Sequence, residues 1–259
     1  MTEDEFSMKK FPYTRDEIIC KEQADEYNHC LIKKIVSRKI TFPESYELFE
    51  KFAVRPPLVI TLEGKDRVGK TETAKKLQEV FDFDVFKFPY EEVESGKILR
   101  AILDEKLPHE PWSFQALMIL NKEESIPFIK ELGYKGGAVV FDRGHESAKV
   151  YGVLDGIPEA WIDQFDERVP YSDLTIVLDG KGWENDTGIY SDPVFQQKVK
   201  DGYLRWVNRP DHKNRVALIN ADRSRNEVFR DVVYAILEVA KIRNDRWLIN
   251  KLSKVINNA

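Results

Sequence analysis

The residues best suited to chemistry lie between Gly64 and Thr71. Gly64, four further residues, and then Gly69, Lys70 and Thr71 fit the spacing G-x-x-x-x-G-K-[ST]. Glycines let a backbone curl so that its N–H groups point at phosphate oxygens, lysine adds a positive charge, and a threonine hydroxyl can ligate Mg²⁺. An apolar run precedes the stretch and a helical pattern follows it, so a plain glycine turn is the weaker interpretation. We predict that this stretch binds a nucleoside triphosphate through Gly64, Lys65, Asp66, Arg67, Val68, Gly69, Lys70, Thr71 and Glu72.

Charged residues add to this motif at two places. Arg67 lies inside the loop, where it can neutralise charge that develops on a transferred phosphoryl group; the alternative is a solvated arginine at the loop tip. Asp142 ends an apolar run, and Arg143 follows it. In open α/β sheets, ligands bind beyond the carboxyl ends of the strands. We therefore predict that Asp142 helps Thr71 to hold Mg²⁺ and that Arg143 faces a phosphate.

The elements that must position these residues follow an alternating pattern. Short apolar runs alternate with helical patterns along the chain and lie at 58–63, 83–88, 137–142, 174–179 and 215–221. Buried strands alternating with helices indicate a parallel sheet covered on both faces. We predict an α/β fold with a five-stranded parallel sheet flanked by helices. Ser224 and Glu227 have the spacing of a capping box at the start of the last predicted helix.

The first 55 residues differ from the rest, because their few apolar residues lie among many charged ones. We predict an N-terminal helical extension at 1–55 that packs against a main domain at 56–259. The formal net charge of −5 gives no overall basic footprint for nucleic acid. No apolar run approaches the roughly 20 residues of a membrane span, and the N-terminus is unlike a signal peptide. We expect a cytoplasmic protein with neither a membrane nor a nucleic acid as partner.

Several stretches together resemble the thymidylate kinase family of nucleoside monophosphate kinases over about residues 57–240. The likeness is carried, in the family's order, by "LEGKDRVGKT", "FKFP" followed by "GKILRAIL", "FDRGHESAKVY", "YSDPVFQQKVKDGYLRWV" and "VALINADRSRNEVFRDV". The resemblance implies a P-loop kinase domain at 56–259 with a lid near 180–192. It also implies ATP as phosphoryl donor, Mg²⁺, and a deoxynucleoside 5′-monophosphate as acceptor, namely dTMP or a related nucleotide. Family members are usually homodimers, so a homodimer is expected.

The resemblance also implies roles for individual residues. Lys70, Arg67, Arg143 and Asp142 would be catalytic, and Thr71 and Asp142 would hold the metal. The implied acceptor-binding residues are Asp66, Phe88, Arg100, Phe114, Met118, Lys122, Arg143, Ser147, Tyr151 and Tyr190.

The chain departs from the family pattern on the acceptor side. Tyr90, Glu91 and Glu92 stand where the family usually offers an arginine for the acceptor phosphate, and a carboxylate there would repel a phosphate. Arg100 on the next predicted helix is the candidate substitute. Met118 stands where a stacking aromatic is expected, with Phe114 one turn earlier as a possible replacement.

Other departures leave the acceptor's base open. Lys122 replaces an arginine and lacks its planar fork. Gly144 and Gly152 stand where larger or polar residues are usual. Two alternatives remain at this stage. One is a polyphosphate-driven nucleotide kinase, against which the negative net charge argues. The other is a nucleotide-binding regulatory or assembly subunit, which the lost acceptor arginine favours and the intact phosphate loop disfavours.

Overall fold

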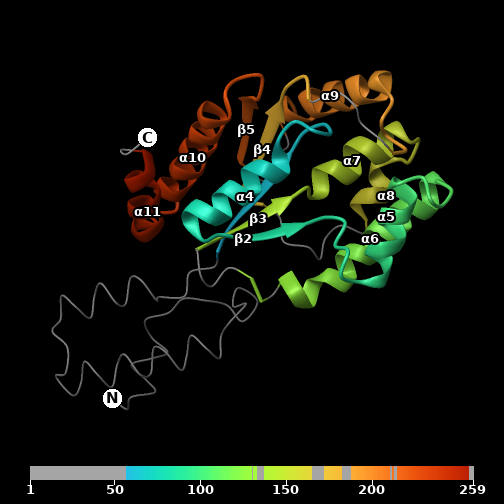
Figure 1. Ribbon diagram of the computed structural model, residues 1–259, viewed down its shortest axis with the longest axis horizontal. Helices are drawn as coiled ribbons and strands as arrows, with labels where there is room; N and C mark the ends of the chain where they lie inside the picture. The colour runs from blue at the N-terminus through green and yellow to red at the C-terminus, as the bar shows by residue number, and fades with distance from the viewer. Residues whose placement is uncertain are drawn as a thin grey trace, which may run out of the picture.

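The computed structural model describes residues 57–129, 131–132, 137–164, 172–182, 188–210, 212 and 215–256. Figure 1 shows these elements as one layered body, in which helices lie on both sides of a central sheet. The predicted extension at 1–55 lies outside the described residues, so it stays a prediction.

The sheet has five parallel strands in the order β2-β3-β1-β4-β5. The strands are β1 (Leu58–Glu63), β2 (Asp84–Lys87), β3 (Ala138–Asp142), β4 (Leu174–Asp179) and β5 (Arg215–Asn220). The predicted five-stranded parallel sheet is confirmed. The register pairs Asp142 with Leu62 on one side and with Lys87 on the other. The carboxyl ends of these three strands therefore meet at one edge of the sheet.

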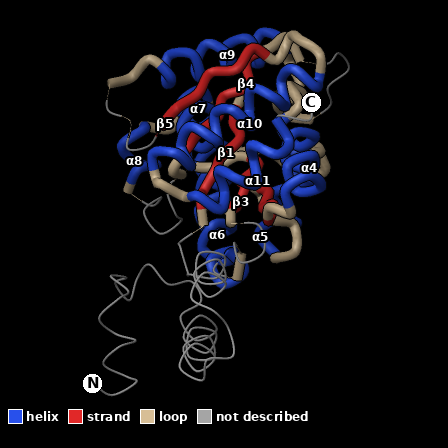
Figure 2. The backbone as a smooth tube through the Cα atoms, turned by 90° about the vertical axis from the view of Figure 1, so that its left-hand side faces the viewer, coloured by secondary structure: helices blue, strands red, loops and turns tan. Residues whose placement is uncertain are grey.

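Helices cover both faces of the sheet, as Figures 1 and 2 show from two directions. One face packs against α4 (Lys70–Phe81), α10 (Arg225–Ile242) and α11 (Arg246–Ile256). The other face packs against α5 (Glu94–Leu103), α6 (Pro111–Ile129), α7 (His145–Leu154) and α9 (Pro193–Val207), and the short α8 (Glu159–Asp163) lies beside α7. The sequence interpretation had not assigned α7, α8 or α11.

Strand β1 shows how the two faces are divided. Leu58, Ile60 and Leu62 point to the α4 and α10 side, where they form part of an apolar core with Leu77. Because side chains alternate along a strand, Glu63 points the other way, and its carboxylate is bonded to residues of α7 and α9. The apolar core thus anchors β1 while the opposite face presents polar groups near the sheet edge.

The predicted cap of α10 is confirmed. The hydroxyl of Ser224 accepts a hydrogen bond from the backbone N–H of Glu227, and the Glu227 carboxylate accepts one from the Ser224 backbone N–H. Two of the otherwise unpaired N–H groups at the helix start are thereby bonded. Among the helices that the structure describes, none is long and apolar enough to cross a membrane.

Candidate active site

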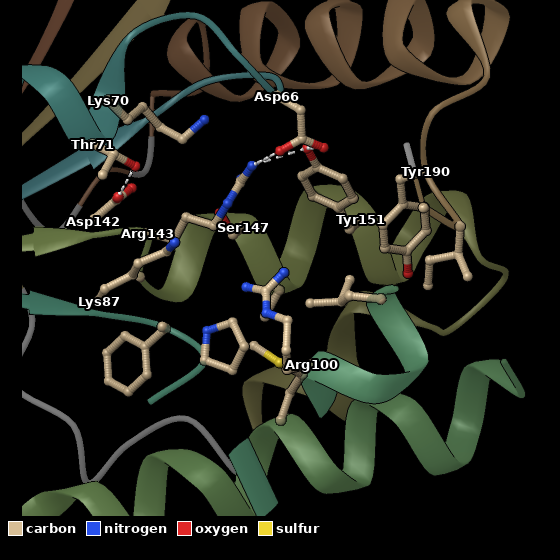
Figure 3. Close-up of a pocket in the computed structure, with 18 of the residues that line it drawn as sticks. Asp66, Lys70, Thr71, Lys87, Arg100, Asp142, Arg143, Ser147, Tyr151 and Tyr190 are labelled. Atoms are coloured by element: carbon tan, nitrogen blue, oxygen red, sulfur yellow. Dashed lines mark hydrogen bonds and ion pairs between the residues drawn. The ribbon is translucent and has the colours of Figure 1, made fainter. Parts of the chain in front are cut away.

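A cavity of about 810 Å³ lies at the carboxyl ends of β1, β2 and β3. The phosphate loop forms one wall, and residues of α5, α6 and α7 form the others (Figure 3). Tyr190, which belongs to the C-terminal part of the predicted lid, lines it as well. Ligands bind at this edge of open α/β sheets, so the cavity is where the predicted donor and acceptor sites should meet.

The phosphate loop runs from the end of β1 into the start of α4. Gly64 has a φ of +131°, and a Cβ there would lie 2.4 Å from the carbonyl oxygen of Leu178. Only glycine fits such a position. Gly69 is the N-cap residue of α4, so the first N–H groups of that helix face the cavity side of the loop. Local backbone geometry therefore builds an anion-binding turn here.

Lys70 is buried and turned back onto this loop. Its Nζ donates to the carbonyl oxygens of Gly64 at 3.0 Å and Lys65 at 2.6 Å. Burial and the nearby Arg143 guanidinium lower the pKa of Lys70 to about 8. An ammonium held in this way is available to a phosphate, because two neutral carbonyls satisfy it less fully than an anion does.

Thr71 and Asp142 meet at the mouth of the loop, with Thr71 Oγ1 donating to Asp142 Oδ2 at 2.5 Å. A hydroxyl and a carboxylate oxygen in contact are the donors that Mg²⁺ prefers, and Mg²⁺ is usually bound by one or two carboxylates together with substrate phosphates. In the described part of the chain, no group of three or more His, Cys, Asp or Glu residues could hold a metal. The Thr71–Asp142 pair fits a magnesium ion that substrate phosphates also bind.

The centre of the site is an ion pair between Asp66 and Arg143 (Figure 3). Tyr151 Oη donates to Asp66 Oδ2 at 3.1 Å, and Gln196 Nε2 donates to the same oxygen at 3.0 Å. Burial alone would raise the pKa of Asp66, but the charges of Arg143 and Lys70 and these hydrogen bonds hold it below its usual value. Arg143 Nη1 also donates to Ser147 Oγ at 3.1 Å. The guanidinium is therefore held in place from two sides.

Glu63 positions Arg143, although the sequence analysis did not single it out. Glu63 is fully buried, and its Oε1 accepts from the backbone N–H groups of Gly144 at 2.8 Å and Ser147 at 3.1 Å. Its Oε2 accepts from Ser147 Oγ at 2.6 Å and Tyr203 Oη at 2.7 Å. These bonds tie the start of α7 to the end of β1. They also hold the backbone next to Arg143, whose φ of +74° is uncommon for a non-glycine residue.

The acceptor side of the cavity contains two further basic residues. Arg100 lines the cavity, but its Nε lies 3.0 Å from Glu91 Oε1 and its Nη1 lies 3.7 Å from Asp104 Oδ1. Lys87 also lines the cavity, and its ammonium makes no hydrogen bond or ion pair within the described residues. In Figure 3 the Lys87 side chain extends from β2 toward Arg143. Sequence reasoning missed Lys87, although its place at the end of a strand, just before Phe88, was a usable signal.

Tyr190 closes the cavity on the side of α9. Its ring stacks on Phe195 with centroids 5.0 Å apart, and its Oη donates to Asp155 Oδ2 at 2.5 Å. Gln196 Nε2 donates to the Tyr190 carbonyl at 2.9 Å, and Gln196 Oε1 accepts from the Asp66 backbone N–H at 3.0 Å. Gln196 thus links this wall to the phosphate loop. Nothing in the spacing of the sequence pointed to that role.

The structure brings most of the predicted site residues together. Those that line the cavity are Asp66, Arg67, Gly69, Lys70, Thr71, Glu72, Phe88, Arg100, Phe114, Met118, Asp142, Arg143, Ser147, Tyr151 and Tyr190. Gly64, Lys65 and Val68 belong to the loop but not to the lining. Lys122 is buried on α6 and is likewise absent from the lining. Residues 183–187 of the predicted lid lie outside the described residues.

Solved structures share this fold. The thymidylate kinase of Candida albicans matches with a TM-score of 0.56 at 22% identity, covering 73% of this chain and 93% of that one. The thymidylate kinase of Ehrlichia chaffeensis matches with a TM-score of 0.55 at 24% identity, covering 69% of this chain and 98% of that one.

The parallel sheet, the phosphate loop after its first strand and the aspartate at the end of the neighbouring strand define a P-loop nucleotide-binding protein. The sequence matches the family described as thymidylate kinase over residues 62–232. Human thymidylate kinase is 30% identical over 174 residues, which are 60% of this chain and 82% of that protein. The chain therefore belongs to the thymidylate kinase family.

A second relative agrees with this assignment. The probable thymidylate kinase of Methanococcus maripaludis is 27% identical over 191 residues, which are 69% of this chain and 94% of that protein. The chain is thus a nucleoside monophosphate kinase that takes its phosphoryl group from ATP. The family assignment favours neither the polyphosphate-driven kinase nor the non-catalytic nucleotide-binding subunit.

Proposed function

We propose that the protein transfers the γ-phosphoryl group of Mg·ATP to the 5′-phosphate of dTMP. The observation that carries the proposal is the convergence of two charged assemblies on one cavity. Lys70 and the Thr71–Asp142 pair face it from the donor side. Arg143, held by Asp66, faces it from the acceptor side. Phosphoryl transfer is mostly positioning and charge stabilisation, so such an arrangement is what the reaction needs.

On the donor side, the backbone N–H groups of the loop and the Lys70 ammonium bind the phosphates of ATP. Arg67 lines the cavity from the loop and neutralises charge on the group in transfer. Thr71 and Asp142 hold Mg²⁺, which when bound neutralises phosphate charge. No side chain acts as a nucleophile, because an oxygen of the acceptor phosphate attacks the γ-phosphorus.

On the acceptor side, Arg143 and Lys87 bind the 5′-phosphate of dTMP. Lys87 takes the place of the missing arginine, because Arg100 already pairs with Glu91 and Asp104. Tyr151 stands beside the sugar, where its ring limits the room for a 2′-hydroxyl. The base lies between apolar side chains that line the cavity, namely Phe88, Leu103, Phe114 and Met118.

The predicted lid near 180–192 closes over the reacting groups and keeps water from the phosphoryl group. The C-terminal part of this segment is attached to α5, since the backbone N–H of Ile189 donates to the carbonyl of Leu103 at 3.2 Å. Because this bond already joins the segment to the end of α5, the rest of the lid can close toward α5 while this end stays in place.

We also infer a homodimer that forms through a helical face. Helix α6 exposes three large apolar side chains, those of Trp112, Leu120 and Phe128. Exposed apolar side chains gathered on one element are typical of a protein–protein interface. Sedimentation equilibrium of the full-length chain should give twice the mass of one chain; a single-chain mass at all concentrations would contradict the inference.

A coupled ADP-release assay tests the proposed function. Purified protein with Mg·ATP is given dTMP, dUMP, 5-hydroxymethyl-dUMP, dCMP, dAMP, dGMP and the ribonucleotides. We expect the highest kcat/KM with dTMP, and no turnover in K70A. A higher kcat/KM with another nucleotide would contradict the proposed acceptor. ATP binding without turnover of any acceptor would contradict the kinase itself.

A further inference from the structure

Gln115 on α6 is a buried amide that opens into the acceptor side of the cavity. Its side chain is only 2% exposed, and it lines the cavity beside Phe114 and Met118. Within the described part of the chain, its amide forms no hydrogen bond. Buried polar groups in folded proteins are nearly always bonded. An amide left open toward a cavity is therefore placed to bond a ligand.

Gly152 on α7 makes the room that this amide occupies. A Cβ at position 152 would lie 2.9 Å from Gln115 Nε2 and 3.1 Å from its Cδ. It would also lie 2.7 Å from Cδ1 of Ile162. The amide of Gln115 therefore packs against the backbone of α7, one residue after the cavity-lining Tyr151. This packing holds the side chain at the cavity wall.

The cavity that Gln115 lines has both polar and apolar walls. Phe88, Leu103, Phe114 and Met118 form flat or flexible hydrophobic walls. Sites for small ligands combine such walls with a few polar groups that fix orientation. A glutamine amide offers one acceptor and one donor direction in the same plane. The complementary partner is the edge of a planar ring on which an N–H and a C=O stand side by side.

We propose that Gln115 reads the base of the acceptor nucleotide, pairing its Oε1 and Nε2 with the adjacent N–H and C=O groups on the edge of a thymine. The same two-contact pairing between an amide side chain and a base edge is used in nucleic-acid recognition. Lys122 lies outside the cavity lining, which leaves Gln115 as the polar side chain of α6 in that lining. This inference rests on the proposed function, because it assigns the base contact of that acceptor.

The test compares dTMP with its non-polar isostere, the 2,4-difluorotoluene deoxynucleotide, which keeps the shape of thymine but lacks the N–H and C=O edge. The variant Q115M replaces the amide with an apolar chain of similar length. Q197M is the matched control, since Gln197 is exposed on α9. We expect Q115M to lower kcat/KM for dTMP about 10- to 100-fold, and for the isostere hardly at all.

A second variant keeps the test decisive if Q115M does not fold, as judged by its thermal melting. G152A retains the amide but displaces it, so it should also reduce the preference for dTMP over the isostere. If the folded variants retain the wild-type preference while the wild type phosphorylates dTMP, the role of Gln115 is overturned and the proposed function stands. If the wild type phosphorylates no deoxynucleotide, the proposed function itself fails, and with it this inference.

Discussion

The charge of a single side chain can control ligand binding at this site, and Lys70 is the clearest example. Its ammonium is buried against the Gly64 and Lys65 carbonyls. Burial and Arg143 make the ammonium easier to deprotonate than an exposed lysine. A bound triphosphate reverses that balance, because an anion favours the charged form. The proton on Lys70 and the affinity for ATP are therefore linked.

We predict that ATP affinity falls as pH rises above about 8, the pKa of Lys70 in the free protein. Below that pH the ammonium is already charged, so binding takes up no proton. Above it, a proton must be taken up on binding, and affinity falls toward tenfold per pH unit. Titration calorimetry from pH 7 to 9.5 in buffers of different ionisation enthalpy measures both effects. K70R, which stays charged, is the control and should bind with a flat profile.

Lys87 carries the second prediction at this scale. K87M should raise the KM for dTMP and lower kcat/KM about tenfold or more, since a charge-assisted hydrogen bond to phosphate is lost. The KM for ATP should stay as it is. K198M, at an exposed lysine on α9, is the matched control. If K87M leaves the KM for dTMP unaltered while R100M raises it, then Arg100 is the acceptor-phosphate residue and the assignment to Lys87 is wrong.

At the scale of elements, α7 is the helix that matters most for the reaction. It contributes Ser147 and Tyr151 to the cavity, and Arg143 lies two residues before its start. Its start is bonded to β1 through the buried carboxylate of Glu63. The placement of the guanidinium thus depends on a residue of the central strand that touches no proposed substrate.

E63A should therefore affect both stability and activity. It leaves the backbone N–H groups of Gly144 and Ser147 buried without their acceptor, which costs about 2–4 kcal/mol of unfolding free energy. It should also lower kcat, because the backbone next to Arg143 loses the hydrogen bonds that hold it to β1. E63Q keeps the shape and one acceptor, so its losses should be smaller. Urea denaturation and steady-state kinetics give the two quantities; an E63A protein with wild-type stability and kcat would show that the carboxylate does not position Arg143.

The elements differ in how far the sequence could predict them. The strands and the phosphate loop depend on local patterns, namely apolar runs, glycine spacing and the Ser224–Glu227 cap, and these were predicted closely. Helix α7 was not assigned as a helix, because the stretch after Arg143 is read first for its polar motif. Gln115, Gln196 and Glu63 depend on contacts between elements far apart in the chain. No local spacing could have revealed them.

At the scale of the whole molecule, the order of the strands brings the site together. Gly64, Asp142 and Lys87 are far apart in the sequence but stand at neighbouring strand ends, because β3 lies between β1 and β2. Helices α5, α6 and α7 then close the cavity on one side of this edge. The same arrangement explains why the donor side follows the family pattern while the acceptor side departs from it. The donor site is made mostly by one loop, to which β3 adds Asp142, whereas the acceptor site is assembled from several elements that can each change.

The hydrogen bonds and ion pair of Asp66 limit which segments can be exchanged between members of this family. This one carboxylate joins the phosphate loop to Arg143, to Tyr151 of α7 and to Gln196 of α9. A loop transplanted from a relative with a different residue at this position would leave the guanidinium of Arg143 buried without its counter-charge, which is strongly destabilising. The phosphate loop therefore cannot be exchanged between relatives on its own. Chimeras within the family should work only when the loop, α7 and α9 are exchanged as one unit.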